Sequence, residues 1–141
     1  MAEITKATVT RNGVAVPTAS LSSLVPGQDK TIVGLVAGEA IAAGDACYIK
    51  SDGKVWLATG SAATAPARAR GVAMGGAAVN EPVTLIEGVN VGGYALGMTP
   101  GADLFLSGTV PGGLADAASV GGTSPIAFAV TATKIRVLSL K

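Results

Sequence analysis

Hydrophobic and polar residues alternate over short distances along most of the chain, which is typical of β-strands. The pattern predicts strands over residues 31–37, 46–50, 55–58, 70–74, 83–86 and 134–140. No long segment carries an apolar stripe with helical spacing and caps, and only residues 114–118 have the character of a single helical turn. We therefore predict an all-β fold, a small barrel or sandwich of short strands.

The second half of the chain echoes the first. Residues 41–49 resemble residues 98–106 in the positions of a glycine, an aromatic residue and aliphatic residues, and residues 70–74 resemble residues 126–130. The general likeness of glycine-rich β proteins is the alternative explanation. The echo predicts an internal duplication within one β-rich body, residues 31–141, with similar halves at about 31–87 and 88–141.

Residues 1–30 follow a different pattern. The pair Asn12-Gly13 is a strong signal for a two-residue hairpin turn between residues 7–11 and 14–16, and Pro17 then ends the strand. The serines and prolines that follow favour extended chain. Two interpretations stay open: an extended N-terminal arm outside the core, or an edge hairpin of a single barrel.

Composition excludes several classes of function. Histidine is absent, which removes a histidine general base, a Ser-His-Asp or Cys-His site and a histidine metal ligand. The single cysteine, Cys47, cannot form an internal disulfide or a cysteine-rich zinc site. The net charge is only +1 and the chain has no basic cluster, so we expect no direct contact with nucleic acid. We also expect no membrane partner and no signal peptide, because no apolar stretch has the required length.

The remaining polar motifs have structural explanations. Asp45 and Asp103 lie near the starts of corresponding strands, but each sits in a glycine turn, where aspartate commonly bonds its own backbone. Asp52-Gly53-Lys54 is similar to the lysine-bearing turn of lipoyl and biotinyl carrier domains, but the glycine before the lysine departs from their pattern. We therefore predict that the chain is not an enzyme and has no cofactor, no metal and no catalytic residues.

Large side chains are few, because aromatic residues make up only 4% of the chain. Strands of such small residues need the large side chains that they have, so we expect Trp56, Phe105 and Phe128 to be buried in the core. Charged residues make up 13%, about half of the usual share of roughly 25%. A surface with so little charge is suited to burial against other proteins.

Several segments together resemble a known family. The segments are VAGEAIAAGDACYI at 36–49, DGKVWLA at 52–58, RGVA at 70–73, LGMTPGADLFLS at 96–107 and SPIAFAV at 124–130. They are similar to small proteins of tailed bacteriophages, namely the capsid decoration or cement proteins and related head proteins, over about residues 33–138. The resemblance implies a β-rich body, often trimeric, that sits on the outside of the capsid and clamps adjacent major capsid subunits.

We accordingly expect a structural virion protein on the capsid exterior, synthesised in the host cytoplasm. Its expected partners are the major capsid protein and further copies of itself, with a homotrimer favoured. The expected contact residues are the aliphatic side chains of the N-terminal segment: Val14, Val16, Leu21, Leu24 and Val25. The alternative is another phage structural module, such as a head or tail fibre base or a carbohydrate-binding surface protein.

Overall fold

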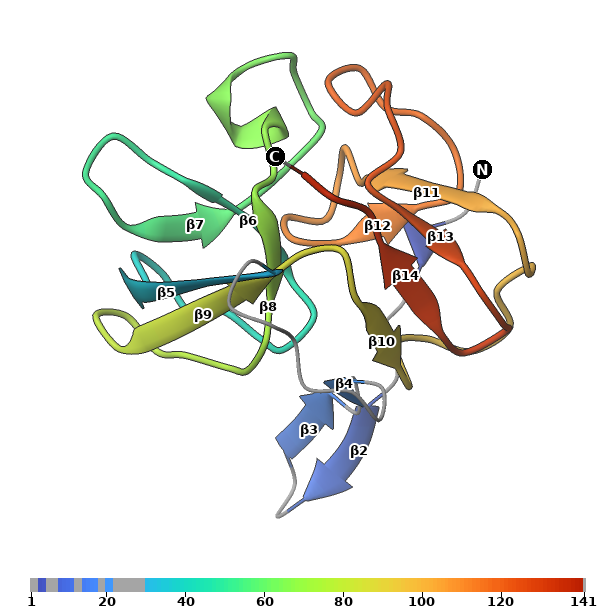
Figure 1. Cartoon of the computed structure of the whole chain (residues 1–141), viewed down its shortest axis with the longest axis horizontal. Coiled ribbons are helices and arrows are strands. Elements are labelled where there is room, and N and C mark those ends of the chain that lie inside the picture. Colours follow the sequence, from blue (N-terminus) through green and yellow to red (C-terminus); the bar gives the residue numbers. More distant parts are fainter. Residues whose placement is uncertain (1–2, 5–7, 12–13, 18–19, 22–29, 141) are drawn as a thin grey trace.

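The computed structural model describes residues 3–4, 8–11, 14–17, 20–21 and 30–140, with side chains placed at 3–4 and 30–140. Antiparallel strands form two large sheets that lie side by side, one from each half of the body (Figure 1). This arrangement confirms the all-β prediction of short strands in a small barrel or sandwich.

The first half forms a five-stranded sheet. Its strands are β5 (Thr31–Val36), β6 (Ala46–Ile49), β7 (Val55–Leu57), β8 (Gly71–Ala73) and β9 (Pro82–Ile86). The spatial order is β5-β9-β8-β6-β7, and one turn of 3₁₀ helix, η2 (Ala65–Ala67), lies between β7 and β8. Ala37, directly after β5, bridges Val55 of β7, so the sheet curls back on itself.

The second half repeats this strand order. Its strands are β10 (Asn90–Gly92), β11 (Asp103–Leu106), β12 (Leu114–Ala115), β13 (Ala127–Ala129) and β14 (Ile135–Val137). They lie in the order β10-β14-β13-β11-β12, which matches β5-β9-β8-β6-β7 strand for strand. The expected helical turn at 114–118 is wrong, because this stretch begins with β12, which pairs with β11.

Local geometry repeats together with the strand order. Gly44 and Gly101 precede the equivalent strands β6 and β11 and both have positive φ, +85° and +84°, which glycine adopts without strain. The amide of Gly44 donates to the carbonyl of Ala73, and the amide of Gly101 donates to the carbonyl of Ala129. The echo in the sequence therefore coincides with a repeat in topology and in turn geometry.

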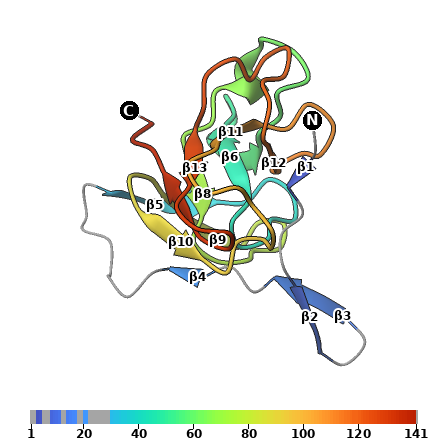
Figure 2. The ribbon, with the colours of Figure 1, turned by 90° about the vertical axis from the view of Figure 1, so that its right-hand side faces the viewer.

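Residues of the N-terminal segment complete the second sheet. Strand β1 (Glu3–Ile4) pairs with β12, and β4 (Ser20–Leu21) pairs with β10, which extends the sheet to seven strands. Between them, β2 (Thr8–Arg11) and β3 (Val14–Pro17) form a two-stranded hairpin that projects from the body (Figures 1 and 2). The strands of the predicted hairpin are thus confirmed, and the turn itself lies outside the described residues.

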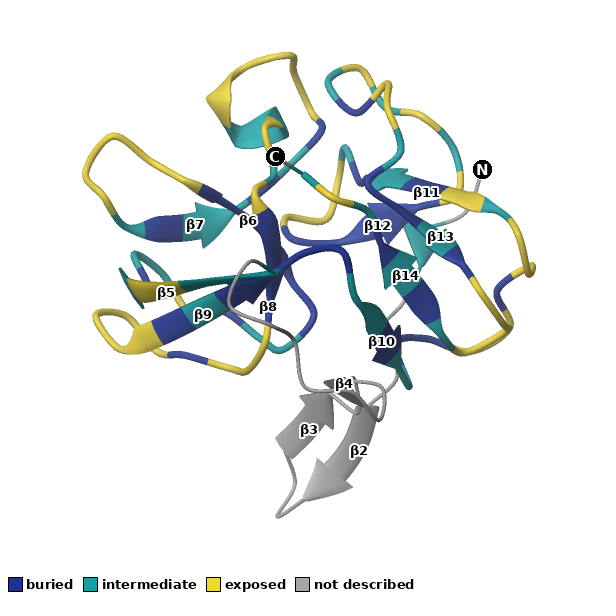
Figure 3. Ribbon diagram, in the orientation of Figure 1, coloured by how far each residue is buried: buried dark blue, intermediate teal, exposed yellow. Residues whose placement is uncertain are grey.

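Two hydrophobic clusters form the core. Buried residues lie in strands of both sheets (Figure 3). The larger cluster joins both halves: Ala46, Tyr48, Val72 and Ile86 from the first, and Leu104, Leu106, Ala127, Ile135 and Val137 from the second. The smaller cluster lies within the first half and includes Cys47, Val55, Ala73 and Leu85. The two sheets therefore share one core and form a single body.

The expectation that Trp56, Phe105 and Phe128 are buried is wrong, because each is only half-buried. The buried aromatic residues are Tyr48 and Tyr94. Successive side chains of a strand point to opposite faces, and smaller neighbours of the two phenylalanines occupy the inward positions. The core is therefore built mainly from aliphatic side chains with two tyrosines, and both phenylalanines point outward.

Candidate functional site

The face of the seven-stranded sheet that points away from the core carries both phenylalanines. In β11, Leu104 and Leu106 are each 1% exposed, so Phe105 between them points outward. In β13, the two flanking alanines are buried and Phe128 points outward in the same way. We call this surface the outer face; it comprises Asn90, Asp103, Phe105, Phe128 and Arg136.

Strand pairing sets four of these residues in one row across the sheet. Asp103 pairs with Phe128, Phe128 pairs with Arg136, and Arg136 pairs with Asn90. Directly paired residues carry their side chains on the same face, close enough to contact one another. The row therefore runs from an exposed carboxylate over an aromatic ring to a guanidinium and an amide.

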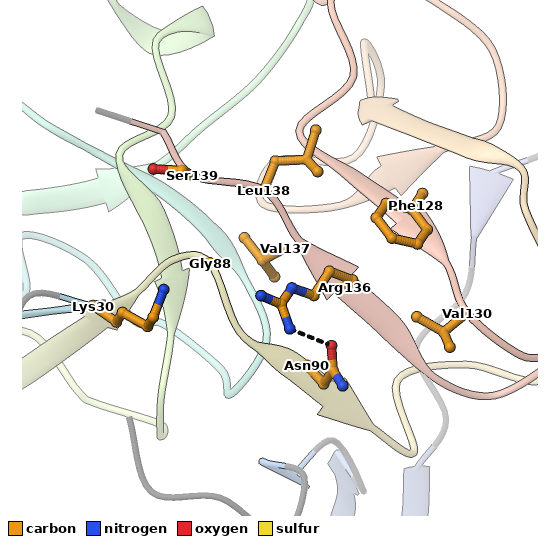
Figure 4. A pocket seen from close by; sticks show the side chains of 9 residues that line it. All are labelled: Lys30, Gly88, Asn90, Phe128, Val130, Arg136, Val137, Leu138 and Ser139. Carbon is orange, nitrogen blue, oxygen red and sulfur yellow. Dashed lines mark hydrogen bonds between the residues drawn. The ribbon is translucent and has the colours of Figure 1, made fainter. Parts of the chain in front are cut away.

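The position of the Arg136 side chain is fixed by Asn90. Its Nη1 donates a hydrogen bond of 3.2 Å to the Asn90 side-chain oxygen, and both residues are half-buried (Figure 4). A guanidinium carries five N–H donors in a rigid fork, and this bond uses one of them. The bond to Asn90 thus holds the Arg136 side chain on the outer face, and other N–H groups of the guanidinium can donate to a ligand there.

An open groove of about 480 Å³ lies over three residues of this row, Asn90, Arg136 and Phe128, and Asp103 is outside its lining. Its lining residues are Lys30, Gly88, Asn90, Phe128, Val130, Arg136, Val137, Leu138 and Ser139 (Figure 4). The Lys30 Nζ lies 3.1 Å from the position that a Cβ would take on Gly88, so the lysine crosses this glycine. Two cationic side chains therefore line one groove together with apolar surface, and no acidic residue is among the described lining residues.

The N-terminal strand β1 is tied to the body by a buried polar contact. The Glu3 carboxylate accepts hydrogen bonds from the hydroxyls of Ser107, at 2.7 Å, and Thr109. The Ser107 hydroxyl, which is fully buried, in turn accepts the amides of Thr109 and Val110. Ile4 packs against the larger core cluster. Glu3 and Ile4 are therefore an integral part of the sheet edge.

The predicted contact residues fall into three groups. Val14 and Val16 lie in β3, where they pair with Arg11 and Val9 of the projecting hairpin. Leu21 lies in β4 and pairs with Val91 at the edge of the seven-stranded sheet. Leu24 and Val25 lie outside the described residues. Val14 and Val16 therefore belong to the two-stranded sheet and Leu21 to the seven-stranded sheet.

Asp45 and Asp103 differ in environment and do not form a pair at equivalent positions. Asp45 is buried, and its carboxylate accepts the Ala42 amide at 2.8 Å, while Asp103 is exposed on the outer face. Cys47 is buried and its thiol donates to the Asp45 carbonyl. Among the residues that the structure describes, no three of the types that bind metal ions come together.

Tyr94 is the most deeply buried aromatic residue. Its hydroxyl has no hydrogen-bond partner within the described part of the chain. Burial raises the pKa of Tyr94 well above its usual value, and the negative charge of Asp45 raises it further. The phenol therefore stays protonated in the folded protein.

Trp56 lies at the hairpin between β6 and β7. Its ring packs against the Cα of Gly38, the Lys50 ammonium lies 3.9 Å from the ring centroid, and its Nε1 donates to the Asp52 carboxylate. The Lys54 amide also donates to Asp52 and lowers the pKa of this carboxyl below its ordinary value. The Asp-Gly-Lys motif is thus a turn stabilised by hydrogen bonds, and the nearby Trp56 ring is already in contact with Gly38 and Lys50.

Sequence reasoning missed the groove because its residues come from separate strands of the second half and from Lys30, which directly precedes the first half. The signal that was present is the small size of the residues around Phe128, which leaves its ring as the only large group on the outward side of β13. The helices in the described ranges are too short to cross a membrane. The chain matches no protein-family model, no curated protein and no solved structure.

Proposed function

We propose that the chain is a structural virion protein that binds the outer surface of a phage capsid and stabilises contacts between major capsid subunits. The observation that carries the proposal is the outer face, where Phe105 and Phe128 are only partly buried and Phe128 pairs with Arg136. Aromatic residues and arginine are enriched in protein–protein interfaces, whose centres are depleted of other charges. Such a face on a low-charge β body is suited to protein binding.

The proposal includes self-association, with a homotrimer favoured, and a location on the capsid exterior. Light scattering of the purified protein measures its molar mass in solution and so tests the homotrimer directly. Capsids assembled without the protein then receive increasing amounts of it. Binding that saturates at a stoichiometry set by the capsid symmetry supports the proposal. Absence of binding, or binding that rises without saturation, contradicts it.

The hairpin of β2 and β3 is the second proposed contact with the capsid or a neighbouring subunit, through Val14 and Val16. Thr8 pairs with Pro17, so the two ends of the hairpin lie side by side. A short Gly-Ser linker can therefore replace residues 8–17 while β1 and β4 keep their pairing with the body. We expect this variant to keep its thermal unfolding temperature but to bind capsids more weakly. Unchanged capsid binding would remove the hairpin from the proposal.

The alternative of a carbohydrate-binding module finds less support. Sugar stacking requires an accessible aromatic platform, and tryptophan is the most effective residue for it. The ring of Trp56 is already in contact with Gly38 and Lys50. A phage head protein that binds other proteins is therefore the better explanation of the outward-pointing phenylalanines.

A further inference from the structure

The repeat allows the outer face to be compared with its counterpart in the first half. The row Asp103–Phe128–Arg136–Asn90 corresponds by strand pairing to Ala46, Val72, Ile86 and Thr31. In the first half this row belongs to the core shared by the sheets, and its alanine, valine and isoleucine are at most 2% exposed. The same face of the repeat is therefore buried in the first half and open to solvent in the second half.

The residues that replace the buried row indicate what covers the open one. Val72 and Ile86 are matched by Phe128 and Arg136, so the apolar area persists while a cation is added. Lys30 adds a second cation across the groove. A ligand that fits this groove must offer negative charge to Arg136 and Lys30 and apolar surface to Phe128.

We propose that this groove binds an extended acidic segment of a partner protein. Carboxylates of the segment bond to the Arg136 donors that Asn90 does not use and to the Lys30 ammonium, and an apolar side chain lies over Phe128 and Val130. Because β4 already pairs with β10 at the sheet edge, the segment lies across the face and is held by side chains. The inference deepens the proposed function, since it names the chemistry of the partner's contact.

Charge and shape favour a polypeptide over other anions. Nucleic acid is bound through rows of phosphate contacts, whereas this groove offers two cations and a net protein charge of only +1. A free inorganic anion leaves the apolar part of the groove uncovered. Carboxylate groups on an extended chain satisfy both requirements, because alternate side chains of such a chain are about 7 Å apart.

The test uses the whole protein and a blocked peptide in which glutamate and valine alternate over five residues. We expect amide NMR shifts at residues 88–90, 128–130 and 136–139, with a dissociation constant of about 1 mM. Affinity should fall about tenfold in Arg136→Gln and in Lys30→Gln, since each removes a charge-assisted contact. Lys54→Gln is the matched control, because it changes the net charge equally while its amine bonds Asn80 in the other half.

Salt and competing ligands complete the design. Binding should weaken between about 0.1 M and 1 M salt, where the Debye length falls from about 10 Å to about 3 Å. A matching lysine–valine peptide should not bind. The proposal is overturned if neither glutamine variant weakens binding, if the lysine peptide binds equally, or if a short oligothymidylate or inorganic phosphate binds these residues more tightly than the acidic peptide. It is also overturned if no saturable shift occurs. None of these measurements involves capsids. A negative result therefore contradicts only the acidic-segment proposal, and the capsid-binding experiment tests the proposed function separately.

Discussion

Replacing Tyr94 by phenylalanine tests whether its buried hydroxyl lowers the stability of the fold. The side chain is 0% exposed, and its hydroxyl lacks a hydrogen-bond partner among the described residues. A buried polar group without a partner costs about 1–3 kcal/mol, while phenylalanine keeps the ring and its packing. We expect Tyr94→Phe to raise the free energy of unfolding by about 1–2 kcal/mol.

The same hydroxyl gives a second signature at alkaline pH. The pKa of Tyr94 is raised in the folded protein by burial and by Asp45, whereas in the unfolded chain it is about 10. Above that pH the folded state keeps a proton that the unfolded state has lost. The titration of Tyr94 therefore leaves the stability of the wild type unchanged below pH 10 and lowers it as the pH rises from 10 towards the folded pKa. The gap between Tyr94→Phe and the wild type should widen by about 1.4 kcal/mol per pH unit above 10.

Urea denaturation followed by the fluorescence of the single tryptophan measures both effects. Tyr48→Phe is the control, because Tyr48 belongs to the same core cluster and its hydroxyl is not an orphan. A loss of more than about 1 kcal/mol in Tyr94→Phe at neutral pH would refute the reasoning, since it would show that the hydroxyl has a partner such as an internal water. A gap that stays constant above pH 10 would refute the pKa argument.

Three further predictions concern the outer face, the N-terminal strand and the β6–β7 turn. Phe128→Ala should cost less than about 1.5 kcal/mol of unfolding free energy and Leu104→Ala about 2–5 kcal/mol, and equal costs in urea denaturation would contradict the assigned faces. Glu3→Ala should cost about 1–3 kcal/mol in thermal unfolding, because it removes the acceptor of a buried hydroxyl; a loss near zero would mean that β1 does not hold the sheet edge. NMR titration should place the pKa of Asp52 below its ordinary value because of the Lys54 amide, so its contribution to stability is present at neutral pH and decreases as the pH falls; an ordinary or raised midpoint would disprove this bond.

Alternation in the sequence was sufficient to predict the positions of most strands but not which face of each strand is buried. In β6 and β7 the predicted ranges differ from the observed ones by one residue at the end. Around Phe128 both alternating sets are apolar, so periodicity alone cannot decide which set faces the core. Around Phe105 the polar Asp103 and Ser107 alternate with Leu104 and Leu106, which marks the phenylalanine as part of the outward set. In the structure, leucine, isoleucine, valine and alanine side chains fill the space between the sheets, and this packing determines which side of each strand is buried.

The candidate site could not be predicted from the sequence. Arg136 and Asn90 are far apart in the chain and meet only because β14 pairs with β10. Lys30 joins them from the position directly before β5. Such a site depends on strand order, and the duplication seen in the sequence could have supplied that order only if the fold of one half had been known.

The pairing of β1 with β12 also has a consequence for folding during synthesis. Glu3 and Ser107, which share a hydrogen bond, are 104 residues apart. At a translation rate of about 5–20 residues per second, the N-terminal strand waits roughly 5–20 s for its partner to be made. Contacts of such long sequence separation also slow the folding search itself. Until β1 and β4 dock, both edges of the second sheet expose unpaired backbone groups, so the newly made chain passes through a period in which it is most prone to aggregate.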